Sequence, residues 1–146
     1  MKKLLPKSLN NPSGFTLVEL MVVITIIAIL ATIGVTIYSG AQKAARDAIR
    51  RSDILSIAKA LEANYVPGAS SPYQALAGTM FVGGVIPAAP STGGGAYTLT
   101  GTLPGSSWTY CTDLENASGG NSTANDGTGF DIDSTSGGFF CMKNSQ

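Results

Sequence analysis

The sequence of 146 residues predicts an α+β fold, in which a small antiparallel sheet packs on the second half of one long N-terminal helix. Three features support this prediction. Residues 20–38 form an apolar run, residues 41–65 continue it without Gly or Pro, and residues 67–146 are rich in Gly, Ser and Thr. The length of the apolar run favours a helix, because strands rarely exceed about 10 residues.

The composition excludes several classes of function. Charged residues make up 12% of the chain, apolar residues 44%, and there is no His. Without His there is no Ser-His-Asp or Cys-His nucleophile, and most zinc and haem sites are excluded. We therefore expect no enzymatic activity.

The net charge of zero hides an asymmetry along the chain. Residues 1–51 carry seven basic and two acidic residues, a net charge of +5, whereas residues 52–146 carry two basic and seven acidic residues, a net charge of −5. Basic residues that flank an apolar run indicate a membrane segment, and the acidic part indicates a soluble domain. Because no basic cluster lies in the acidic part, nucleic-acid binding by this chain is not expected.

The first two segments are predicted to be a leader and a membrane span. Residues 1–14 are basic and interrupted by Pro6 and Pro12, as in a short cytoplasmic tail. Residues 15–42 include the apolar run, whose length is close to the roughly 20 residues that cross a bilayer. The run is too long for an ordinary cleaved secretory signal. Orientation stays open on charge alone, since basic residues occur on both sides of the run.

Residues 43–66 are expected to continue the same helix outside the membrane. Apolar positions at helical spacing form one stripe, namely Ile54, Ile57, Ala58, Leu61 and Tyr65. Asp47 and Arg51 are expected to pair at i, i+4 on an exposed face. Pro67 and Gly68 end the helix. A helix over residues 15–64 would be roughly 75 Å long, so its second half needs a cover outside the bilayer.

Residues 67–146 are predicted to form a small β-rich domain. Strand-like runs at residues 97–102, 107–114 and 138–142 indicate three or four antiparallel strands, with residues 101–106 as a hairpin connection. Trp108 and Tyr110 are expected in the core. Residues 115–137 read as a long polar loop.

Cys111 and Cys141, the only two Cys, lie in two of these runs. They predict either a disulfide or two buried thiols. A disulfide would close a loop of about 30 residues, contribute roughly 3–4 kcal/mol, and place the domain outside the cytoplasm.

No cofactor is expected, although calcium is one possibility. Asp126, Asp131 and Asp133 lie in the polar loop among Asn and Gly residues, and calcium prefers clustered oxygen ligands at a tight turn. The spacing does not fit an EF-hand. The alternative is a solvated acidic loop.

Glu19 is the most informative single residue, because it directly precedes an uncharged run. A carboxylate in lipid is costly, by about 2.5–3.5 kcal/mol, and is normally paired or functional. Thr16 and Glu19 also have the spacing of a helix capping box.

The segment from Gly14 to Glu19, Gly-Phe-Thr-Leu-Val-Glu, followed by an apolar helix, resembles the class III signal of type IV pilins and type II secretion pseudopilins. The resemblance implies that a prepilin peptidase cuts after Gly14 and that the new N-terminal residue, Phe15, is methylated. It implies that Glu19 pairs with the Phe15 amine of a neighbouring subunit, so that the chain becomes a helical homopolymer on an inner-membrane assembly platform. Thr36 stands where many pilins carry a proline. Gly34 could lower the stability of the helix near this position instead.

The leading hypothesis is therefore a structural subunit of a pilus-like filament. The precursor would lie in the bacterial inner membrane with its C-terminal domain outside, and the assembled form in an extracellular filament or a periplasmic pseudopilus. A type II secretion pseudopilin is the alternative within the family. A membrane-anchored lectin-like or calcium-binding module is the alternative from another class, and it would not need Glu19 or a cut after Gly14.

Overall fold

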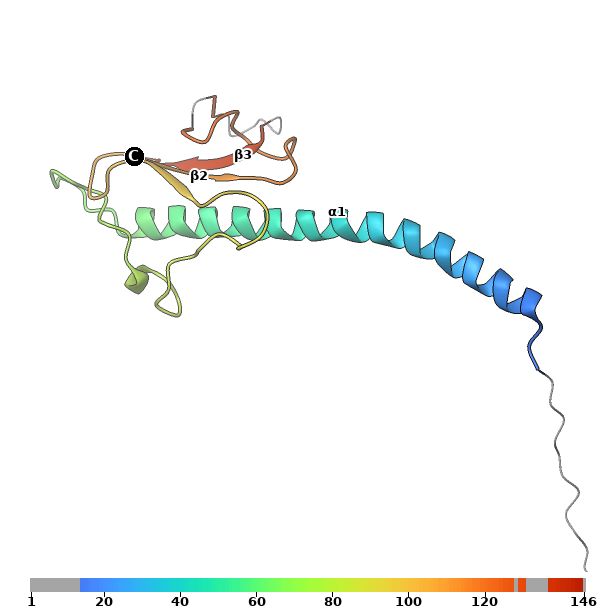
Figure 1. Ribbon diagram of the computed structural model, residues 1–146. Helices are drawn as coiled ribbons and strands as arrows, with labels where there is room; N and C mark the ends of the chain where they lie inside the picture. Colours follow the sequence, from blue (N-terminus) through green and yellow to red (C-terminus); the bar gives the residue numbers. More distant parts are fainter. Residues whose placement is uncertain (1–13, 128, 131–136, 146) are drawn as a thin grey trace, which may run out of the picture. The chain divides into compact units, whose positions relative to one another are not determined.

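The computed structural model describes residues 14–127, 129–130 and 137–145 (Figure 1). The elements are helix α1 (Leu17–Ala63), a 3₁₀ turn η1 (Gly78–Met80) and three strands, β1 (Thr98–Gly101), β2 (Trp108–Asp113) and β3 (Phe139–Lys143). The chain divides after Tyr38 into two compact units. One long helix and a three-stranded antiparallel sheet confirm the predicted fold class.

The first unit contains the apolar half of α1, whose side chains are exposed throughout residues 17–38. By length and composition, α1 is able to cross a membrane. The helix continues through Gly34, and the Thr36 hydroxyl donates to the carbonyl of Ile33 at 2.9 Å. The helix is thus continuous at Gly34 and Thr36, the place where the sequence leaves open whether it melts in a filament.

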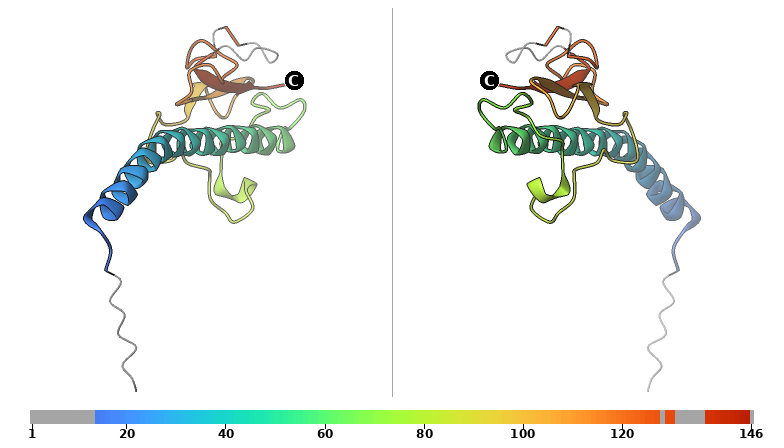
Figure 2. Two further views of the ribbon diagram at one scale, coloured as in Figure 1. Left: turned by 90° about the vertical axis from the view of Figure 1, so that its right-hand side faces the viewer. Right: turned by 90° about the vertical axis from the view of Figure 1, so that its left-hand side faces the viewer.

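The second unit packs its sheet on one face of α1, as both views of Figure 2 show. The shared core consists of buried residues from the helix, a loop and β2: Ile54, Ile57, Ala58, Leu61, Tyr73, Trp108 and Tyr110. The Tyr73 and Trp108 rings meet edge to face, with centroids 6.0 Å apart. The predicted stripe and the predicted core aromatics are confirmed. Tyr65, at the end of the stripe, is half-buried against this core.

The sheet has the order β1-β2-β3, with both pairs antiparallel. In the β2–β3 register Cys111 lies opposite Cys141. Each strand boundary lies within one residue of the boundary predicted from the sequence. The agreement is close because alternating apolar residues and flanking turn residues both mark these strands. The predicted hairpin connection joins β1 to β2.

The segment after β2 is more closely packed than a polar loop suggests. Asn121 is 6% exposed, its amide donates to the Cys141 carbonyl at 3.0 Å, and its Oδ1 accepts the Cys141 N–H at 2.7 Å. Gly120 and Ser122 form isolated bridges to Gly137 and Phe139. This part of the predicted loop is therefore tied to β3 through its own polar groups.

Candidate functional site

The start of α1 is closed by reciprocal hydrogen bonds between Thr16 and Glu19. The Thr16 backbone N–H and hydroxyl both donate to Oε2 of Glu19, at 2.8 and 2.9 Å. The Glu19 backbone N–H donates in return to the Thr16 hydroxyl oxygen at 3.2 Å. This is the predicted capping box, which provides partners for backbone groups that a helix leaves unpaired at its start.

Gly14 and Phe15 lie just before this cap. A side chain at Gly14 would meet open space, and Phe15 is 92% exposed. Among the described residues, nothing therefore covers the peptide bond between them. Cleavage at this bond and methylation of Phe15 stay predictions.

Glu19 has no oppositely charged partner among the described residues. Its neighbours on the helix are exposed apolar side chains, among them Leu17 and Leu20. A carboxylate in such surroundings becomes costly once the helix lies in lipid, because the charge loses its water. A cationic group from another molecule would remove most of that cost.

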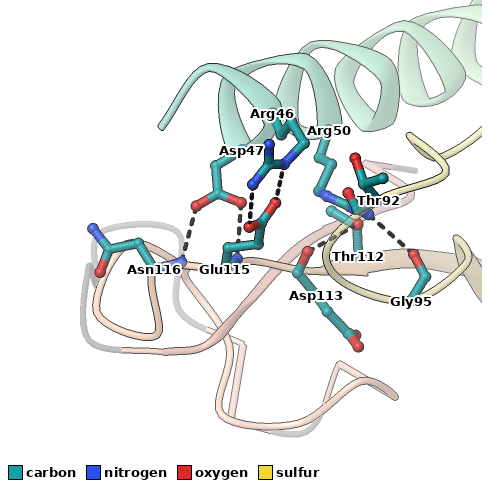
Figure 3. A network of polar contacts seen from close by, with 9 residues as sticks. All are labelled: Arg46, Asp47, Arg50, Thr92, Gly95, Thr112, Asp113, Glu115 and Asn116. Atoms are coloured by element: carbon teal, nitrogen blue, oxygen red, sulfur yellow. Dashed lines mark hydrogen bonds and ion pairs between the residues drawn. The ribbon is translucent and has the colours of Figure 1, made fainter. Parts of the chain in front are cut away.

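In the second unit, Arg46 and Asp47 hold the chain after β2 against α1 (Figure 3). The Asp47 carboxylate accepts the backbone N–H groups of Glu115 and Asn116, at 2.8 and 3.0 Å. Arg46 forms a two-point ion pair with the Glu115 carboxylate, at 2.5 Å from Nε and 2.6 Å from Nη2. This geometry fixes both the position and the orientation of the loop.

The expected exposed pair between Asp47 and Arg51 is wrong. Asp47 is only 3% exposed, and the Arg51 guanidinium donates instead to the Gly119 carbonyl at 2.6 Å. Asp47 faces the loop rather than solvent, and there two backbone N–H groups need an acceptor. The carboxylate satisfies them, and Arg51 is directed to a different part of the same loop.

Arg50 is fully buried and anchors a second loop. Its guanidinium donates to the carbonyls of Gly95 and Thr92, at 3.0 and 3.4 Å. Gly94 has φ +76°, and a Cβ there would lie 2.9 Å from the Arg50 Cζ. Only glycine fits a backbone that passes so close to the guanidinium in this conformation.

These contacts change the acidity of the groups that form them. The hydrogen bonds from Arg46 lower the pKa of Glu115, and the same contact raises the pKa of Arg46. Desolvation raises the pKa of Tyr97, and its hydrogen bond to Asp53, at 2.5 Å, adds to the effect. Burial alone raises the pKa of Tyr110. Each shift follows from a structural contact rather than from a catalytic arrangement.

Cys111 and Cys141 form a disulfide across β2 and β3. Both residues are fully buried. Of the two possibilities that the sequence left open, the disulfide is therefore the correct one. It closes the segment that contains the loop held by Arg46 and Asp47.

An open hollow of about 440 Å³ lies beside the ion pair on α1. Its lining includes Lys43, Asp47, Arg51, Glu115 and Asn116. Both carboxylates already have partners: Glu115 is paired with Arg46, and Asp47 accepts two backbone N–H groups. The hollow thus presents more unpaired donors than unpaired acceptors.

The calcium prediction stays untested. Asp126 is described, whereas Asp131 and Asp133 lie outside the described residues. Within the described ranges, no three His, Cys, Asp or Glu side chains gather in a way that would hold a metal ion.

Ser56 and Lys59 have the Ser-x-x-Lys spacing of some acyl-transfer enzymes. Both line a shallow second hollow against residues 80–87. The Ser56 hydroxyl, however, donates to the Ser52 carbonyl at 2.8 Å. Its proton is therefore held by the helix backbone and not directed to a base, so the spacing carries no catalytic prediction.

The burial of Asp47 and Arg50 is the main feature that the sequence prediction missed. A signal for it was present: counting back from Ile54 by four and three residues along the buried stripe leads to positions 50 and 47. Charged residues on the continuation of an apolar stripe indicate buried polar contacts. Their partners, far away in the chain, give no comparable local signal.

Comparison with known protein families matches residues 9–35 to the prokaryotic N-terminal methylation motif. None of the curated proteins and none of the solved structures compared with the chain matches it. The matched residues contain Gly14, Phe15, the Thr16–Glu19 cap and the start of the exposed apolar helix. The chain therefore carries the N-terminal methylation motif, or class III signal, in agreement with the type IV pilin and pseudopilin families.

Proposed function

We propose that this chain is a structural subunit of a type IV pilus-like filament. The observation that carries the proposal is the methylation motif at residues 9–35 together with the helix that follows it, which is apolar and exposed from Leu17 to Tyr38. Proteins with this motif are generally structural rather than enzymatic. The described contacts in the second unit are likewise those of a folded scaffold.

The chemistry of assembly follows from the charges near the motif. Cleavage after Gly14 by a prepilin peptidase would leave an amine on Phe15, and methylation would keep its positive charge. The Glu19 carboxylate of an incoming subunit would pair with that amine in a subunit already in place. Two charges that are each costly in lipid would form one neutral pair, and they would do so only at one axial offset between subunits.

The apolar helix explains why the product would be a filament. Lipid provides no hydrophobic drive for helices to associate, but the same side chains must be covered once they leave the membrane. The same helix in neighbouring subunits can bury these apolar side chains. A contact that repeats from head to tail without closing produces a helical fibre.

The precursor would lie in the inner membrane, with its second unit on the extracytoplasmic side. The Cys111–Cys141 disulfide supports this side, because such bonds persist in oxidising compartments. The same disulfide and the weakly charged Gly/Ser/Thr-rich sequence favour an extracellular pilus over a periplasmic secretion pseudopilus. An inner-membrane assembly platform would be the further partner.

The mass of the mature chain tests this proposal. We expect filaments sheared from the cell surface to contain a chain that begins at Phe15 and carries one added methyl group. If this processed chain is found only in membranes, cleavage and methylation are supported, and a pseudopilus is favoured over an extracellular pilus. A chain that retains residues 1–14 in the membrane fraction would contradict the proposal and support an anchored binding module.

A further inference from the structure

The hollow beside Lys43 has the donors of a phosphate site. The Lys43 side chain is exposed and makes no hydrogen bond or ion pair with the described residues. Within the same part of the chain, Arg51 makes one hydrogen bond, from Nη2 to the Gly119 carbonyl, so other N–H groups of its guanidinium stay unused. A lysine ammonium and an incompletely used guanidinium are the groups that proteins direct at phosphate oxygens.

Asn116 supplies a third donor. Its Oδ1 accepts the hydroxyl of Ser118 at 2.9 Å and the Ser118 backbone N–H at 3.4 Å. These contacts orient the carboxamide, so that its NH₂ group remains as the unpaired end of an exposed side chain that lines the hollow. The donors therefore come from α1 and from the loop that Asp47 holds against it.

The oxygen atoms of both acidic side chains in the hollow already accept hydrogen bonds, but among the described residues only Glu115 is paired with a positive charge. Asp47 is occupied by two backbone N–H groups, and Glu115 is occupied by Arg46. Once Glu115 is paired with Arg46, the positive charges of Lys43 and Arg51 stand against the single negative charge of Asp47. The hollow therefore favours an anion over a cation.

The position of the hollow on α1 indicates where the anion comes from. A hydrocarbon core of about 30 Å takes up about 20 residues of helix, so a span that begins at Leu17 ends near Tyr38. Gly40 lines the hollow, and Lys43 follows Tyr38 by five residues on the same helix. If the span ends near Tyr38, a lysine five residues further along the chain falls in the headgroup layer, where lipid phosphates are concentrated.

We propose that this hollow binds the phosphate group of an anionic membrane phospholipid. Lys43, Arg51 and Asn116 donate to the phosphate oxygens, and the site retains the second unit at the membrane surface while the precursor awaits assembly. The inference rests on the membrane insertion of α1 that the proposed function requires, but not on cleavage, methylation or polymerisation.

The test uses the full chain in bilayer nanodiscs of phosphatidylcholine mixed with phosphatidylglycerol. Native mass spectrometry after release counts the phosphatidylglycerol molecules that stay bound. We expect one retained lipid, and about fivefold less retention for Lys43→Gln, since one basic residue near an anionic surface contributes roughly that factor. Lys59→Gln is the matched control, because Lys59 is also exposed on α1 but does not line the hollow. Arg51→Lys, which keeps the charge but loses the fork of donors, should also weaken retention.

The possible outcomes distinguish a lipid site from a free-anion site and from the absence of any site. Equal retention by wild type, Lys43→Gln and Lys59→Gln would overturn the proposal. Loss of the bound lipid on addition of millimolar inorganic phosphate, with equal binding of phosphate to the chain in detergent, would show a free-anion site and overturn the lipid assignment. Failure of the chain to enter nanodiscs of any composition would instead contradict membrane insertion, and with it the proposed function.

Discussion

The guanidinium of Arg46 and the carboxylate of Glu115 form a two-point ion pair across 69 positions of the chain. One partner lies on α1 and the other in the loop directly after β2. The next residue, Asp47, caps two backbone N–H groups of the same loop. The disulfide-closed part of the domain is thus joined to the helix by polar contacts rather than by apolar packing alone.

Because of this ion pair, we expect the thermal stability of the fold to decrease at acidic pH. Because the folded pKa of Glu115 is lowered by Arg46, the pair stabilises the fold above the ordinary carboxyl pKa, and this stabilisation is lost as the pH falls through the lowered value. We expect Arg46→Gln to unfold at a lower temperature than wild type at pH 7. The gap should narrow as the pH falls below the ordinary carboxyl range, because protonation of Glu115 removes the charge that pairs with Arg46. Thermal melts of wild type, Arg46→Gln and Glu115→Gln over this range provide the measurement, and a gap independent of pH would contradict the prediction.

Asp47→Ala should destabilise the second unit through the groups it leaves unpaired. The N–H groups of Glu115 and Asn116 would lose their acceptor. Because both contacts are only partly buried, we expect a total cost near the lower end of the roughly 1–3 kcal/mol that a fully buried unpaired donor costs. Asp47→Asn keeps one acceptor oxygen and should fall between wild type and the alanine variant. Urea denaturation gives the three free energies of unfolding, and an alanine variant as stable as wild type would show that water replaces the carboxylate.

Gly94→Ala should cost more than Gly68→Ala, although both glycines have similar positive φ angles of 76° and 80°. The backbone penalty of about 1–2 kcal/mol is shared by the two variants. Only at Gly94 would the new Cβ meet the buried Arg50 guanidinium, whereas nothing lies within 4 Å at Gly68. The difference between their free energies of unfolding isolates the clash, and equal values would mean that the Arg50 side chain moves freely.

Removal of the disulfide should lower the free energy of unfolding by roughly 3–4 kcal/mol, as the chain-entropy account gives for a loop of this size. The bond joins residues 30 apart. The double variant Cys111→Ala/Cys141→Ala is compared with wild type in the presence and absence of a thiol reductant. Reductant should destabilise only the wild type, and an equal response of the double variant would point to a different effect of the reagent.

Glu19→Gln should separate processing from assembly. Glutamine keeps the length and one acceptor oxygen of the side chain, so the Thr16 cap persists in weakened form. The charge needed for pairing with a Phe15 amine is lost. We expect normal cleavage and methylation by mass spectrometry, and at least about tenfold fewer sheared filaments, which is the factor for a loss of 1.4 kcal/mol. Filaments at wild-type yield would refute the role proposed for the carboxylate.

Local features of the sequence determined much of this protein. The helix was predictable from the uncharged run, and its buried face from the spacing of Ile54, Ile57 and Leu61. Helical periodicity can be recognised from the residues of a few turns alone. The Thr16–Glu19 cap was likewise predictable, since both partners lie within one turn. Strand positions followed from alternation and turn residues.

Tertiary structure decided the partners of groups that lie far apart in sequence. The cysteine register, the burial of Arg50 and the engagement of Asp47 with residues 115 and 116 depend on how the sheet docks on α1. Local propensity carries no information about that docking, because a charged residue has the same helical preference whether it meets solvent or a loop 68 residues away. The sequence by itself therefore determined the helix, its cap and its apolar surface, and only the folded chain decided which polar groups hold the loops in place.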